Sequence, residues 1–416
     1  MKSRDPAGLF QGRWTVFSLA SLLFILSQFY RVSNAIIAPD LQKDLELSAE
    51  ELGLLSAAFF YAFALVQVPL GIALDRLGGR RTMTLLSLIG AGGALLFAAA
   101  HSFAAAFAGR ALLGLGMAGN LMGSMKLLTR WFSPREFATL SGLMLAMGTL
   151  GNMLAATPLA AAKEWIGWRE SFGMLGLFTA AVAVCFFALV REGPSGEDQP
   201  GASGFAPGPA WKEALKTLCR NANYWIISLG TFFRYGTFVA IQGLWIGPYM
   251  IQQLHMSPIA AGNLLLLLNT GLILGSPLGG WLSDRVLRSR KKVIVLGLAM
   301  MALVLAALGA GWGETGAAAL AVLLFSFGLF GSFGIVMYAH IKELMPSEMS
   351  GTALTGINLF TMLGGAAMLQ GLGWVLDHVV AAGGRTAPDY HPAFLLCAGG
   401  VALALVGYLF ATDTRP

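Results

Sequence analysis

Three arginines lie inside long apolar stretches, and they are the residues best suited to bind a ligand. Arg31, Arg110 and Arg234 each stand among neighbours that are almost entirely uncharged. A guanidinium donates two parallel hydrogen bonds, which suits a carboxylate or a phosphate. No Asp or Glu lies in the middle of these stretches to neutralise the arginines. The pattern predicts binding of an anion, and the alternative is a structural role in which each arginine pairs with carbonyls or buried amides.

The apolar stretches that carry these arginines are long enough to cross a membrane. The chain has 416 residues, of which 56% are hydrophobic and 12% charged, whereas a soluble domain has about 25% charged residues. Helices are expected, because barrel strands would alternate with a period of two. The sequence predicts an all-α membrane protein in the lipid bilayer with twelve spans, at about 14–38, 52–74, 82–101, 104–128, 137–162, 169–190, 222–250, 258–283, 293–312, 316–341, 351–376 and 393–411.

The basic residues predict the orientation of the spans. With both termini in the cytoplasm, the inner segments hold 19 of the 27 Lys and Arg residues and the outer loops hold only four. Such an excess on one side is typical of cytoplasmic loops. We therefore expect a multi-pass protein of a bacterial cytoplasmic membrane. The net charge of +6 follows from this topology, and no nucleic-acid partner is expected.

The two halves of the chain repeat each other. A shift of 209 residues maps Pro39 onto Pro248, Gly53 onto Gly262 and Asp75 onto Asp284. Two such halves related by an axis along the membrane normal are a known transporter architecture, with the substrate site near the midplane. We expect two pseudo-symmetric six-helix bundles, 1–190 and 221–416. The segment 191–220 is expected to be a cytoplasmic linker with a short interfacial helix.

The loops after spans 2 and 8 carry acids and arginines that suit a gate. Asp75 can face the positive N-terminus of a neighbouring helix, and Asp284 is the acid at the repeat-related position. Arg76, Arg80 and Arg81 can pair with Glu136, and ordinary positive-inside anchoring is the alternative. The loop Gly-Ile-Ala-Leu-Asp-Arg-Leu-Gly-Gly-Arg-Arg at 71–81 resembles the signature loop of the major facilitator superfamily. The candidate gating residues are Asp75, Arg76, Arg80, Arg81, Glu136, Asp284 and Arg285.

Spans 1 and 7 resemble two families within that superfamily. The surroundings of Arg31 are similar to those in the organophosphate:phosphate antiporters and the anion:cation symporters. Arg234-Tyr-Gly is similar to the antiporters, whose two arginines hold the phosphate, so the resemblance implies that Arg31 and Arg234 bind an anion. The symporters carry an Asp and a Glu where this chain has Tyr30 and Met117. This departure favours anion exchange over proton symport.

The function expected is secondary active transport of a small organic anion by alternating access. The anion would be a carboxylate, an organophosphate or a polycarboxylate chelator, with a coupling ion or counter-anion. The alternatives are a transporter of neutral or cationic solutes and a non-transporting sensor or assembly partner. The sequence shows no nucleotide-binding loop or metal cluster, so we expect no enzyme activity, cofactor or metal, and we expect a monomer. The candidate binding residues are Arg31, Arg234, Arg110, Tyr30, Asn34, Gln242 and Asn358.

Overall fold

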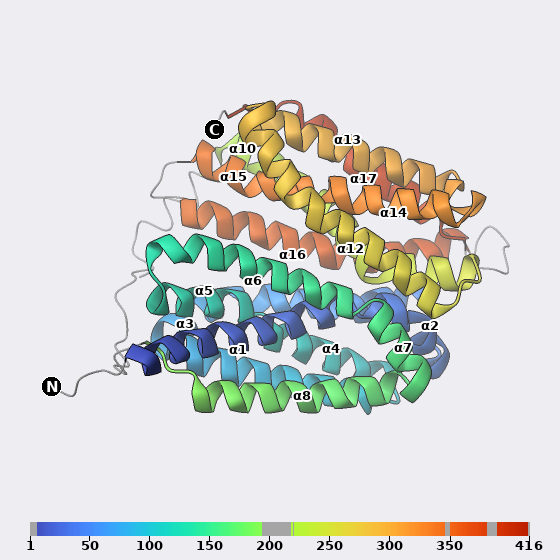
Figure 1. Cartoon of the computed structure of the whole chain (residues 1–416). Coiled ribbons are helices and arrows are strands. Elements are labelled where there is room, and N and C mark those ends of the chain that lie inside the picture. The colour runs from blue at the N-terminus through green and yellow to red at the C-terminus, as the bar shows by residue number, and fades with distance from the viewer. Residues whose placement is uncertain (1–5, 194–217, 219, 346–349, 381–388, 415–416) are drawn as a thin grey trace. The chain divides into compact units, whose positions relative to one another are not determined.

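Helices make up nearly all of the structure, a computed structural model that describes residues 6–193, 218, 220–345, 350–380 and 389–414. No β-strand occurs in these ranges. The chain divides into two compact units, Met1–Ser33 with Ala58–Gly204, and Asn34–Ala57 with Phe205–Pro416. Figure 1 shows the helices of each unit lying side by side. The predicted linker 191–220 falls almost wholly outside the described residues.

The first unit is built from α1, most of α3, and α4 to α8. Helix α3 contains two spans, because Gly78 inside it has φ 81° and ψ 169° and bends the backbone. Glycine adopts this left-handed φ at no steric cost. The bounds are α1 (Pro6–Val32), α3 (Ala49–Ala98), α4 (Phe103–Met117), α5 (Asn120–Trp131), α6 (Pro134–Leu154), α7 (Thr157–Ile166) and α8 (Trp168–Leu189).

The second unit contains α2, the start of α3 and the helices after the predicted linker. Several of its helices include short 3₁₀ or π-helical turns, labelled η. The bounds are α2 (Asn34–Leu45), α10 (Ala222–Ala240), η1 (Ile241–Trp245), α11 (Ile246–Pro248), η2 (Tyr249–Gln253), α12 (Pro258–Trp281), η3 (Leu282–Val286), α13 (Arg290–Gly309), η4 (Trp312–Thr315), α14 (Ala317–Gly331), η5 (Ser332–Ile335), α15 (Val336–Leu344), α16 (Ser350–Val375), η7 (Leu376–Val380) and α17 (His391–Tyr408).

The helices of each unit pack closely through small residues. In the first unit, a side chain at Gly114 would collide with the carbonyl group of Phe59. In the second unit, Gly328 of α14 lies against the Leu268 carbonyl of α12 in the same way, and Gly364 lies against the Phe232 carbonyl. Close backbone contact of this kind is typical of helices packed in membranes, where small side chains replace hydrophobic driving force.

Eleven described stretches are long and apolar enough to cross a membrane. The predicted seventh span, 222–250, is helical but is not among them. Its polar and aromatic residues lower its hydropathy, and every residue from 236 to 250 is buried. π-Helical turns interrupt this stretch twice, and such turns are frequent at functional sites.

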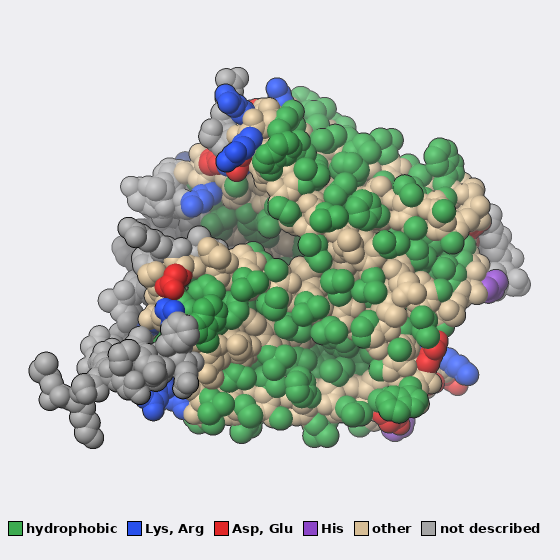
Figure 2. All heavy atoms as spheres, viewed as in Figure 1, with side chains coloured by type: hydrophobic (Ala, Val, Ile, Leu, Met, Phe, Trp, Pro, Cys, Tyr) green, Lys and Arg blue, Asp and Glu red, His purple; other side chains and the backbone are tan. Residues whose placement is uncertain are grey.

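The outward faces of many helices are apolar, as a lipid-facing surface requires. In Figure 2, hydrophobic side chains cover much of the visible flank, and Lys and Arg gather near helix ends. Large apolar side chains are exposed on α8 and α12, including Met174, Leu177, Phe178, Ile273, Leu274 and Leu278. In a water-soluble protein such a surface would be an aggregation hazard, whereas lipid solvates it.

Candidate functional site

Arg31 lies at the end of α1, beside a break in the first span. Helix α1 ends at Val32 and α2 begins at Asn34. The guanidinium of Arg31 lies 5.0 Å from the centre of the Phe63 ring and 5.9 Å from that of Phe60, both on α3. Aromatic faces attract a guanidinium. The half-buried Arg31 side chain therefore lies against two aromatic rings at the break between α1 and α2.

Arg110 on α4 is almost completely buried and is bonded to the first span. Its NH1 group donates to the Tyr30 carbonyl at 2.9 Å, one residue from Arg31. Its guanidinium also lies near the rings of Phe59 and Phe97, at 5.3 and 5.8 Å. The Tyr30 hydroxyl shares a 3.0 Å hydrogen bond with Thr179. The backbone carbonyl and the side-chain hydroxyl of Tyr30 are therefore both hydrogen-bonded. Arg110 binds the backbone of the first span next to its break.

Arg234 on α10 is the candidate binding residue of the second unit. Its side chain is buried, with 7% exposure, and its NH1 group donates to the Gly331 carbonyl at 2.7 Å. It lies so close to Gly334 that any side chain there would collide with the guanidinium. The buried Nε atom has no hydrogen-bond partner, and the described bonds of Arg234 include no carboxylate. The guanidinium therefore keeps a buried donor available for an anion.

The predicted amide residues of the second unit have different surroundings. Gln242 donates to the Asn269 side chain at 2.7 Å, and Asn34 donates to the Ser56 hydroxyl at 2.7 Å. Both amides are buried, whereas Asn358 on α16 is half-buried. Gln242 follows Arg234 by two helical turns, within the π-helical stretch. Gln242 and Asn34 are therefore already bonded to polar neighbours within the second unit.

The loop after the second span binds a carboxylate that the sequence analysis missed. The Glu192 carboxylate follows α8 and accepts the Gly79 and Arg80 N–H groups at 2.7 and 2.9 Å. Arg130 donates to the same carboxylate at 3.3 Å. The Arg80 guanidinium donates to the Phe187 carbonyl at 2.9 and 2.7 Å. Glu192 thus caps the start of the third span, next to the bend at Gly78.

The remaining candidate gating residues of the first unit are less closely connected. Glu136 lies in the first turn of α6 and accepts the Ser133 N–H at 3.0 Å and Arg13 at 3.3 Å. The Ser133 donors and the nearby Arg13 charge lower the pKa of Glu136. Arg76 and Arg81 are exposed. The side chain of Asp75 lies outside the described residues.

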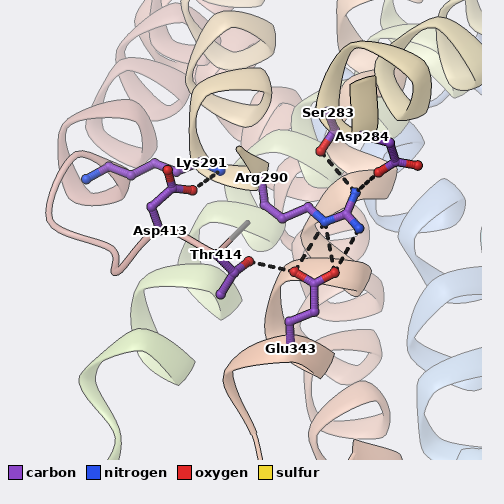
Figure 3. A network of polar contacts seen from close by, with 7 residues as sticks. All are labelled: Ser283, Asp284, Arg290, Lys291, Glu343, Asp413 and Thr414. Carbon is purple, nitrogen blue, oxygen red and sulfur yellow. Dashed lines mark hydrogen bonds and ion pairs between the residues drawn. The ribbon is translucent and has the colours of Figure 1, made fainter. Parts of the chain in front are cut away.

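A polar network surrounds Arg290 in the second unit (Figure 3). The Arg290 guanidinium donates to the Glu343 carboxylate at 2.8 and 3.0 Å and also binds Asp284. Asp413, after α17, accepts the Lys291 N–H at 3.1 Å and the Ser289 hydroxyl at 2.7 Å. Asp284 is thus paired within its own unit, while its predicted neighbour Arg285 is exposed.

The long apolar helices and their exposed hydrophobic faces define an α-helical membrane protein. The sequence matches the Major Facilitator Superfamily over residues 18–368 and 227–416, and the chain belongs to this family. This confirms the predicted family and fold class. Among the described residues, no group of three or more His, Cys, Asp or Glu could hold a metal ion.

Relatives of known or assigned function transport organic acid anions. The chain is 24% identical over 436 residues to the probable galactarate/D-glucarate transporter of Bacillus subtilis, covering 95% of this chain and 91% of the relative. It is 24% identical to the probable sulfoacetate transporter of Cupriavidus necator, covering 69% and 70%. A crystal structure of a bacterial homologue of the human lysosomal transporter Spinster superposes with a TM-score of 0.79 at 17% identity, covering 98% and 96%. That likeness shows the fold.

Proposed function

We propose that this protein carries a small organic acid anion across a bacterial cytoplasmic membrane by alternating access, with Arg31 and Arg234 binding the anion. The observation that carries the proposal is the buried Arg234 guanidinium, which binds one carbonyl and retains a buried Nε donor with no partner. A buried charge without a carboxylate is costly. An anion that enters with its own charge lowers this cost and gains a charge-assisted hydrogen bond.

The relatives narrow the class of anion. The probable sulfoacetate and galactarate/D-glucarate transporters both take small acids that carry more than one anionic group. Two arginines on the first helix of each repeat suit such a substrate, because each can take one group. We therefore propose a dicarboxylate sugar acid or a sulfonated carboxylate as the substrate, in preference to an organophosphate or a chelator.

Arg110 is proposed to act indirectly. Its guanidinium donates to the Tyr30 carbonyl, so its direct effect falls on the backbone next to Arg31.

Exchange against a second anion is proposed as the mode of coupling, since Tyr30 and Met117 replace the carboxylates that the anion:cation symporters carry. The loops that contain Asp75 and Asp284 are proposed to gate the cytoplasmic side, with both termini in the cytoplasm. Labelling of single cysteines from outside tests this orientation.

Uptake by proteoliposomes tests the function. Purified protein should take up D-glucarate or sulfoacetate, and preloading the vesicles with the same anion should accelerate uptake more than an imposed proton gradient does. Arg234→Ala should weaken substrate binding about ten- to a hundredfold, because one charge-assisted bond is worth about 1.5–3 kcal/mol. Arg234→Lys should recover only part of the loss, since an ammonium lacks the two-pronged geometry.

The exposed Arg220 supplies the control, because Arg220→Ala removes the same charge outside the helices that carry the site. Thermal unfolding and gel filtration establish that each variant is folded. If Arg31→Ala and Arg234→Ala both bind the anion as tightly as wild type, the arginines are structural. A transporter of neutral or cationic solutes would then be the better explanation.

A further inference from the structure

The first turn of α3 is capped by a carboxylate from a distant helix of the second unit. Ser48 and Glu51 form a local capping pair, in which each accepts the backbone N–H of the other at 3.0 and 3.1 Å. The next two N–H groups, of Ala49 and Glu50, donate to the Asp377 carboxylate at 3.0 and 2.6 Å. Asp377 lies in η7, more than 300 residues later. The positive end of a helix favours such a carboxylate.

The same helices touch backbone to backbone beneath this cap. A Cβ atom at Gly53 of α3 would lie 2.6 Å from the Leu369 carbonyl oxygen of α16. A Cβ atom at Gly373 of α16 would come still closer to the Ala49 carbonyl oxygen. No side chain separates the two backbones at these points. The contact therefore exists only while α3 and α16 are fully together, and a small separation breaks it.

Helix α2, which precedes α3, also contacts other helices of the second unit. The Gln252 side chain of η2 donates to Gln42 at 2.8 Å and accepts the Tyr390 hydroxyl at 2.6 Å. Deeper in the unit, Gly247 of α11 packs directly against the Ala35 carbonyl. The whole segment 34–57 thus belongs to the second unit by its contacts, although its sequence belongs to the first repeat.

We infer that Asp377 is a latch that holds the segment 34–57 against the second repeat and releases it when the outer side of the transporter opens. The inference rests on the proposed alternating-access function and on the proposed topology, which puts 39–51 and the end of α16 on the outer side. Two repeats that expose a site outward must part there. Their contacts then exist in one state and are absent from the other, so the latch biases that equilibrium.

The latch can be tested by the accessibility of a buried position in the segment. The background variant lacks the native thiols (Cys185→Ser, Cys219→Ser, Cys397→Ala), and Ala38→Cys supplies a reporter that is fully buried in this structure. A membrane-impermeant maleimide is added to sealed cells without substrate. Asp377→Asn should speed labelling about tenfold, as expected for the loss of one charge-assisted contact.

The control is Glu46→Gln, which removes the same charge from an exposed position of the same segment. Labelling in Asp377→Asn at the Glu46→Gln rate would overturn the latch. If Asp377→Asn is not recovered folded, Gly53→Ala decides, because its methyl group prevents close contact with α16. Faster labelling then supports the inference, and an unchanged rate refutes it.

The two proposals can fail separately. Labelling needs no substrate, so faster labelling without anion uptake would keep the latch and refute the proposed substrate. Anion uptake with unchanged labelling in both variants would keep the function and refute the latch.

Discussion

Glu192 in the first unit and Asp413 in the second each follow the last long helix of their unit and accept backbone N–H groups at the start of an earlier helix. Glu192 accepts two N–H groups and Arg130, and its side chain is only 8% exposed. The exposed Asp413 accepts one N–H group at the start of α13, that of Lys291, and the Ser289 hydroxyl. Ser289 itself accepts the Lys292 N–H at 3.0 Å. The second unit therefore divides the capping between two side chains.

The arginines beside these two carboxylates also differ, because the arginine of the second unit has more partners than that of the first. The Arg80 guanidinium in the first unit bonds to the Phe187 carbonyl at the end of α8 and lies 4.3 Å from the centre of the Phe187 ring. Arg290 in the second unit holds the carboxylates of Glu343 and Asp284 together. Both repeats therefore place a carboxylate at the same position, after their last long helix. They differ in the residue that makes most of the polar contacts there. The first unit relies on a buried carboxylate, and the second relies on a guanidinium.

The largest expected effect is that of Glu192→Ala. The change leaves the Gly79 and Arg80 N–H groups without their acceptor and Arg130 without its partner. The buried Gly79 N–H loses the most. The free energy of unfolding should fall by about 2–3 kcal/mol, and the thermal midpoint in detergent should fall by several degrees. Glu192→Gln should lose less, because its carbonyl oxygen still accepts. The exposed Glu164→Ala is the control. An equal midpoint in all three variants would show that the Glu192 cap does not stabilise the protein.

The middle effect compares the two arginines directly. Arg290→Ala should destabilise the protein by about 1.5–3 kcal/mol, since it leaves two neighbouring carboxylates without a cation, whereas Arg80→Ala should cost about 0.5–1 kcal/mol. Thermal unfolding of the two purified variants measures the difference. Arg290→Ala combined with Glu343→Gln should regain part of the loss, because the repulsion between carboxylates is removed. A larger loss from Arg80→Ala than from Arg290→Ala would reverse the comparison.

The sequence predicted the spans and the intramembrane arginines because each is a local property. Apolar length predicts a helix that crosses the membrane, and a charge within it is visible at once. It also predicted the family through the loop at 71–81, and the family is confirmed. The exception was 222–250, where burial inside protein permits more polar residues than a lipid-facing helix would carry. Hydropathy alone therefore undercounts a span of this kind.

The partners of the charged groups could not be predicted, because they depend on tertiary contacts over long separations. Glu192 reaches Gly79, and Asp377 reaches Ala49, across more than 100 and 300 residues. Glu136 was expected to pair with the arginines of 76–81, whereas its described partners are Ser133 and Arg13. Here a local signal existed, since Ser-Pro-Arg-Glu at 133–136 is the pattern of a helix capping box.

The smallest expected effect is that of Asp413→Asn, and it depends on pH. Partial burial raises the pKa of Asp413, but hydrogen bonds from Ser289 and the Lys291 N–H outweigh it, so the pKa lies below its ordinary value. The ionised form is therefore favoured in the folded protein. The stabilisation is complete above the unfolded pKa of about 4 and is lost as the pH falls through the lowered folded pKa.

Unfolding midpoints from pH 3 to pH 8 test this dependence. Asp413→Asn should lower the midpoint by a constant amount between about pH 5 and pH 8, equivalent to less than about 1 kcal/mol because the carboxylate is exposed. The difference from wild type should narrow below about pH 4. The exposed Glu164→Gln should show no such convergence. A deficit in Asp413→Asn as large as that of Glu192→Ala would mean that the second unit also depends on one carboxylate. The division of capping between Asp413 and Ser289 would then be wrong.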